Sequence, residues 1–146
     1  MRLCIANLLL FVSLYMLFPV LSVEMADRLG VPVAQTGVIF LFFTLGMFLV
    51  GPFHAYLVDA YKRKTVCVLS WALMVAATAG YAFVTGMAEL LLLSTVQGAV
   101  FGIATTAGIT LAIDVTNSTL RSAGNVNFSR LARFGMILGI ILGVWL

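Results

Sequence analysis

The chain has 146 residues, of which 63% are hydrophobic and only 9% are charged. A soluble domain of this size could not bury so much apolar surface, so the composition excludes a soluble fold and indicates that lipid surrounds the chain. The formal net charge of +3 comes from a few basic residues separated by long uncharged runs, which excludes a nucleic-acid partner.

Five apolar segments follow one another along the chain. Four uncharged runs reach the roughly 20 residues that a bilayer requires, and they cover residues 3–23, 29–58, 65–88 and 90–113. The last uncharged run, residues 134–146, is too short by itself, so we expect the fifth helix to begin near Ser122 and to include Arg130 and Arg133. The sequence therefore predicts an all-α, polytopic membrane helix bundle, with residues 1–146 forming a single transmembrane bundle of five helices.

The basic residues predict the direction in which the helices cross. If the crossings alternate, every lysine and arginine except Arg28 falls on one side of the membrane. Because basic loops are retained in the cytoplasm, we expect the amino terminus and the turn at residues 59–64 to lie inside. The loops near Asp27 and at residues 87–89 then face outward. We expect a plasma membrane, and favour a bacterial inner membrane.

No residue pattern in the chain indicates an enzyme or a metal site. Cys4 and Cys67 lie in or beside apolar segments, and neither has the neighbouring ligands that a metal would need. We read them as buried free thiols. Nucleophile and base pairs and phosphate-binding loops are also lacking, so we predict no enzymatic activity, no metal and no cofactor.

The turn after the second apolar segment carries a recognisable motif. Residues 51–64 read GPFHAYLVDAYKRK, which resembles the signature loop of the major facilitator superfamily. The positions in register are Leu57, Asp59, Arg63 and Lys64. The positions that depart from the pattern are Ala55, Ala60 and Lys62. We expect His54, at the membrane interface before this motif, to have no chemical role.

Two further motifs of the same family follow in the expected order. Gln97 and Gly98, with Asp114 seventeen residues after Gln97, resemble an element of the fourth helix, although Ser94 replaces its arginine. The fifth helix has a glycine ridge, preceded by Arg121, that resembles the antiporter motif: Gly135, Gly139 and Gly143. Ile140 and Val144 replace the proline and the last glycine of that motif. Without the resemblance, such a ridge indicates close helix packing.

The resemblance to the major facilitator superfamily implies a fold and a function. The family has about twelve helices in two six-helix halves, so the chain would be an amino-terminal half-domain lacking helix six and the carboxy-terminal half. We expect secondary active transport of a small solute by alternating access, like the drug and sugar efflux permeases, with efflux favoured and protons as a candidate coupling ion. The alternative is a truncated, non-transporting membrane fragment or scaffold that needs a partner chain.

The resemblance also implies a charge cluster at the cytoplasmic end. Its members are Asp59, Arg63, Lys64 and Asp114. We hypothesise that Arg63 pairs with both Asp59 and Asp114 in the outward-open state and separates from them when the protein opens inward. The alternative is a solvated basic loop that only fixes the topology.

Polar residues of the fifth helix predict a substrate cavity. Ser122, Asn125, Ser129, Arg130 and Arg133 fall within an arc of roughly 140°. We hypothesise that the two arginines bind an anionic group of a small-molecule substrate and that Asn125 orients it, with Ser129 and Gln97 as further lining residues. The alternative is an amphipathic cytoplasmic segment whose arginines contact lipid headgroups.

Overall fold

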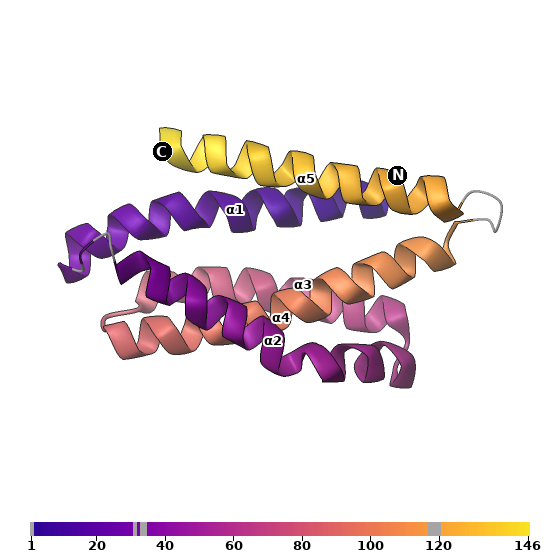
Figure 1. The fold of residues 1–146 in the computed structure, drawn as a ribbon, viewed down its shortest axis with the longest axis horizontal. Coiled ribbons are helices and arrows are strands. Elements are labelled where there is room, and N and C mark those ends of the chain that lie inside the picture. The colour runs from indigo at the N-terminus through magenta and orange to yellow at the C-terminus, as the bar shows by residue number, and fades with distance from the viewer. Residues whose placement is uncertain (1, 31, 33–34, 117–120) are drawn as a thin grey trace. The chain divides into compact units, whose positions relative to one another are not determined.

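The computed structural model describes residues 2–30, 32, 35–116 and 121–146, and in them the chain is helical. These residues form five α-helices that are long and apolar enough to cross a membrane, drawn as coiled ribbons in Figure 1. They are α1 (Arg2–Leu29), α2 (Thr36–Ala60), α3 (Arg63–Gly80), α4 (Met87–Asp114) and α5 (Arg121–Trp145). A short 3₁₀ helix, η2 (Tyr81–Phe83), follows α3. The predicted all-α fold with five membrane helices is confirmed.

Two helices end at positions that differ from the ends of the uncharged runs. The first helix continues past residue 23 to Leu29, because charged residues can extend a helix into the headgroup region until Gly30, with φ of +62°, stops it. The third helix ends at Gly80 rather than near residue 88. There the chain turns, and Glu89 accepts hydrogen bonds from the backbone N–H and the hydroxyl of Thr85, at 2.9 and 3.1 Å.

The chain divides into two compact units, which we describe separately. The terminal unit comprises Met1–Val23 and Gly108–Leu146, and the middle unit comprises Glu24–Ala107. The terminal unit therefore contains most of α1, the end of α4 and the whole of α5. The middle unit contains α2, α3, η2 and the larger part of α4.

In the terminal unit, α5 runs parallel to α1 (Figure 1). Its glycines face carbonyl oxygens of α1: an added Cβ would lie 2.7 Å from Leu8 O at Gly135, 2.6 Å from Val12 O at Gly139 and 2.5 Å from Met16 O at Gly143. Each step of four residues along α5 thus matches a step of four along α1. Because glycine has no side chain, the ridge allows the two backbones to approach closely.

The middle unit has a second close and parallel helix pair, α2 with α4. The missing side chain of Gly98 leaves room for the carbonyl group of Phe43, and that of Gly46 for the carbonyl group of Thr95. Further along the same contact, Gly102 faces Met47 and His54. Residue numbers rise together on both helices, so these helices also run in the same direction.

Candidate functional site

The turn between α2 and α3 brings together part of the predicted charge cluster. α2 ends at Ala60, Tyr61 is extended, and α3 begins at Arg63, which places Arg63 one turn after Asp59. The guanidinium Nη2 of Arg63 lies 3.6 Å from the Asp59 carboxylate. Asp59 is exposed and Arg63 is partly exposed, so this ion pair contributes at most about 1 kcal/mol to stability.

The remaining members of this cluster lie at two places. Lys64 is exposed in the first turn of α3, where the turn is tightened by a hydrogen bond of 2.8 Å from the N–H of Thr65 to the carbonyl of Lys62. Asp114 is exposed at the end of α4, in the terminal unit. The pairing of Arg63 with Asp114 would join the two units, and it stays a prediction.

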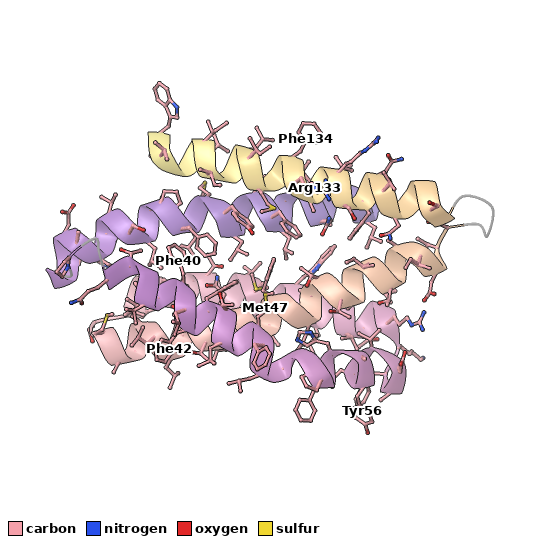
Figure 2. The ribbon with its side chains drawn as sticks, viewed as in Figure 1. Phe40, Phe42, Met47, Tyr56, Arg133 and Phe134 are labelled. Atoms are coloured by element: carbon pink, nitrogen blue, oxygen red, sulfur yellow. The ribbon has the colours of Figure 1, made fainter. Side chains whose placement is uncertain are left out.

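The predicted cavity residues of α5 lie on a face beside the contact with α1. α5 begins at Arg121, so the arginines are inside a helix, as expected from the short last run. Asn125, Arg130 and Arg133 are exposed and Ser129 is partly exposed, whereas Phe128 and the ridge glycines 135, 139 and 143 are buried. Figure 2 labels Arg133 and Phe134 on this helix. The face is free to meet an aqueous cavity, lipid headgroups or further helices.

A buried amide ties α1 to this part of α5. Asn7 is 2% exposed, and its Nδ2 donates a hydrogen bond of 3.3 Å to the carbonyl oxygen of Phe128. The ring of Phe128 also contacts Gly108 near the end of α4, where an added Cβ would lie 3.2 Å from the ring. Two contacts of Phe128 therefore fix α5 next to its polar face: the ring packs against α4, and the carbonyl accepts a buried hydrogen bond from α1.

The middle unit has a buried polar cluster, which we define as Thr78, Tyr81, Ser94 and Gln97. The Tyr81 hydroxyl donates to Oε1 of Gln97 at 2.7 Å and lies 3.1 Å from the Ser94 hydroxyl. Nε2 of Gln97 donates to the hydroxyl of Thr78 at 3.2 Å. Gln97 and Ser94 are 0% and 1% exposed.

This cluster was not predicted from the sequence, and it changes the interpretation of Gln97. The amide oxygen and nitrogen of Gln97 both bond to side chains of α3 and η2, so the residue joins α4 to the preceding segment instead of facing open space. Ser94 stands where the family motif has an arginine, and here its hydroxyl contacts Tyr81. The sequence carries one pattern that could have indicated this cluster. Polar residues are three positions apart in two neighbouring apolar segments: Thr78 and Tyr81 in the third, and Ser94 and Gln97 in the fourth.

Most other hydroxyls in the described helices bond to their own backbone. Thr105 donates to the carbonyls of Phe101 and Gly102, both at 3.0 Å, and Thr106 donates to Gly102 at 3.0 Å. Local bonds of this kind satisfy the hydroxyl without a ligand. Cys67 is 1% exposed, which confirms that thiol as buried, and Cys4 is partly exposed.

One histidine in the signature segment is buried between helices. His54, which we expect at the membrane interface, is 9% exposed and its ring packs against Gly102 of α4. Tyr56, two residues further along α2, shows the opposite orientation, since its ring projects away from the neighbouring helices (Figure 2) and it is 68% exposed. Only a contact with α4, which local sequence does not reveal, distinguishes these two positions.

Comparison with known proteins adds one match. The family model described as Major Facilitator Superfamily matches residues 3–146, which include all five long helices apart from the first residue of α1. No curated protein and no solved structure matches the chain.

Proposed function

The chain belongs to the major facilitator superfamily, and from that premise we propose that it supplies the amino-terminal five helices of a secondary transporter that works by alternating access. Membership makes it a multi-pass membrane protein of a family that transports small solutes, not one of enzymes. The finer proposal is transport of an anionic solute, with efflux as the direction and protons as the coupling ion. The chain would then be one half-domain of a longer protein.

The observation that carries this proposal is the parallel packing of α1 with α5 and of α2 with α4. Helices that cross a membrane in alternation must be parallel when an odd number of crossings lies between them. Both pairs meet that condition, because three helices lie between α1 and α5 and one lies between α2 and α4. In the α1–α5 pair each ridge glycine meets a backbone carbonyl, so this pair can act as a stiff element. Alternating access requires such elements, because it moves rigid groups of helices around a fixed site.

The proposed orientation puts the turn at residues 59–64 in the cytoplasm. Three adjacent basic residues, Lys62, Arg63 and Lys64, lie in this turn, as the positive-inside rule favours. In this orientation Asp59 and Arg63 form a cytoplasmic gate with Lys64 and Asp114. The 3.6 Å contact between Asp59 and Arg63 supports the first half of that gate.

The gate can be tested by transport measurements on the complete transporter in proteoliposomes. We expect Asp59→Asn and Arg63→Ala each to lower the transport rate, since each removes one charge from a contact that must form and break in every cycle. Glu24→Gln is the matched control, because Glu24 is in a similar exposed ion pair, 3.2 Å from Arg28. Rates equal to wild type in both gate variants would show that the loop only fixes topology.

The substrate site is proposed on the polar face of α5. Arg130 and Arg133 would bind an anionic group, Asn125 would orient it, and Ser129 would line the cavity beside them. A guanidinium binds carboxylate or phosphate through two parallel hydrogen bonds, which suits recognition of a small anion. The exposure of both arginines on a helix long enough to cross the membrane supports this site.

A thermal-shift screen of small anions with the purified transporter tests this site. A ligand present at 100 times its Kd stabilises the folded state by about 2.7 kcal/mol, and we expect this gain to disappear in Arg133→Gln. Arg28→Gln is the control, since Arg28 lies in the last turn of α1. Stabilisation by an anion that survives in both Arg130→Gln and Arg133→Gln would remove the role proposed for α5.

A further inference from the structure

The chain's single histidine occupies an unusual place for an ionisable side chain. His54 lies inside α2, less than two helical turns before the helix ends at Ala60, and it is 9% exposed. α2 is apolar enough to cross a membrane. Ionisable groups that are buried in such helices are costly, and they mark ion pathways or proton-transfer sites by default.

The imidazole ring of His54 fills the space that the missing side chain of Gly102 leaves. A Cβ at Gly102 would overlap Cε1 of the ring and would lie 2.7 Å from Nε2 and 3.1 Å from Cγ of Met47. The ring edge that carries Nε2 therefore faces the backbone of α4. Among the described residues, Nε2 has no hydrogen-bond partner. A buried polar atom without a partner costs about 1–3 kcal/mol, so its retention calls for an explanation.

The charged groups on the surrounding helices are distant or already paired. The acidic residues of α4 are Glu89 and Asp114, and each lies more than three helical turns from Gly102 along the helix. On α2 itself, Asp59 is more than one turn beyond His54, and its carboxylate pairs with a guanidinium. The titratable groups in the first turns of α3 are Arg63, Lys64 and the buried thiol of Cys67. None of these groups is placed to neutralise an imidazolium at the Gly102 contact.

We propose that His54 is a proton-binding site and that protonation opens the contact between α2 and α4. The neutral ring fits against Gly102, but the imidazolium brings a charge and a second N–H donor into an enclosed space without an acceptor. The charged ring must therefore turn toward water or push α4 away. Histidine is the side chain whose ordinary titration falls between pH 5 and 8.

This inference rests on the proposed function in one respect, because it gives the transporter a group that takes up a proton within a moving helix pair. The solute need not be known to test it. A proton that binds at His54 changes the spacing of α2 and α4 in the absence of solute. A negative result in the measurements below would therefore contradict the role of His54 without contradicting the proposed transport. Conversely, absence of transport would leave the titration intact.

Selective labelling makes the protonation state of His54 directly measurable. Since these 146 residues contain a single histidine, imidazole labelled with ¹⁵N reports His54 alone in solid-state NMR spectra of this 146-residue chain in lipid vesicles. As the pH falls from 8.5 to 5, we expect the neutral ring to become doubly protonated, and we expect the change to be reversible. A ring that stays neutral over this whole range would overturn the proposal, and this measurement needs no variant.

The linked movement is measured by the distance between spin labels on α2 and α4. Labels at Tyr56→Cys and Val96→Cys occupy exposed positions, with Cys4 and Cys67 changed to alanine. We expect the distance to increase by about 1–2 Å on acidification, the size of helix shifts at packed interfaces. His54→Gln and His54→Asn, which cannot titrate, should give a distance that does not depend on pH. A constant distance in the chain with His54, or the same pH dependence in both variants, would contradict the proposal.

Discussion

The two parallel helix pairs, α1 with α5 and α2 with α4, are both brought together by glycines, yet their contacts differ in composition. In the first pair all the glycines are on α5, and each meets a backbone carbonyl of α1 with the same offset. In the second pair both helices contribute glycines, and the contact also accommodates an imidazole ring. The first contact is a repeating backbone ridge. The second includes a titratable side chain, so its free energy can depend on pH.

Backbone overlap is deeper in the second pair than in the first, so Gly46→Ala should cost more stability than a change in the α5 ridge. The new Cβ would overlap the carbonyl oxygen of Thr95 and lie 3.1 Å from the amide nitrogen of Ala99. Neither is a flexible side chain, so α2 and α4 must separate. We expect a loss of more than about 3 kcal/mol in the free energy of unfolding, measured in bicelles.

Gly51→Ala is the matched control for that change, since it lies on the same helix with no atom within 4 Å of the added Cβ. Its stability should be unchanged or higher by up to about 1 kcal/mol, because alanine favours the helix. Equal losses in the two variants would mean that helix propensity, not the contact with α4, sets the effect.

A smaller loss is expected in the ridge between α1 and α5. In Gly139→Ala the added Cβ would lie 2.6 Å from the carbonyl oxygen of Val12 and 2.9 Å from Cβ of Tyr15. A shift of a few tenths of an ångström relieves part of this overlap, so we expect a loss of about 1–3 kcal/mol. Ile140→Ala, at a 45% exposed position, should change stability by less. If Ile140→Ala cost as much as Gly139→Ala, the ridge would not be the contact that holds α5.

The polar cluster at Tyr81 should contribute less than either glycine contact. Tyr81→Phe removes the hydroxyl that bonds to Gln97 and contacts Ser94, which leaves the oxygen of a fully buried amide without its donor. Hydrogen bonds between membrane helices contribute about 0.6–2 kcal/mol, and we expect a loss of about 1–2 kcal/mol in the free energy of unfolding. The control Tyr61→Phe, at a 63% exposed position, should lose nothing. Equal values for the two tyrosines would assign the cluster no role in holding α4.

The smallest effect on stability is expected at the exposed charge cluster. Asp59→Asn removes an ion pair of 3.6 Å in which the carboxylate is exposed, so the free energy of unfolding should change by less than about 1 kcal/mol. A change well above that value would indicate that Asp59 has an additional, buried partner. Because the effect on stability is small, a reduced transport rate in the same variant would report on the gate itself.

The sequence predicts the helices well because their apolar length is a local property. Five spans and a fifth helix that begins near Ser122 follow directly from the length that a bilayer requires. The ends were less well predicted. The first uncharged run ends before Glu24, although α1 continues to Leu29. The third uncharged run continues past Gly80, where α3 ends.

The partners across helices could not be predicted, since they depend on rotation and register. The ridge glycines of α5 indicated a close contact but not its partner, the carbonyls of α1. Likewise, His54 and Tyr56 are two residues apart with similar polarity, and only the position of α4 makes one buried and the other exposed. Gln97 is expected as a further lining residue of the cavity, and only the positions of α3 and η2 show that its amide bonds to Thr78 and Tyr81.

The most direct test of the account is the side of the membrane on which the turn at residues 59–64 lies. With Cys4 and Cys67 of this 146-residue chain changed to alanine, single cysteines at Lys64 and Thr85 can be labelled in intact cells with a thiol reagent that does not cross membranes. We expect Thr85→Cys to react in intact cells, and Lys64→Cys to react only after the membrane is permeabilised. Reaction of Lys64→Cys in intact cells, with Thr85→Cys protected, would contradict the orientation on which the cytoplasmic gate depends.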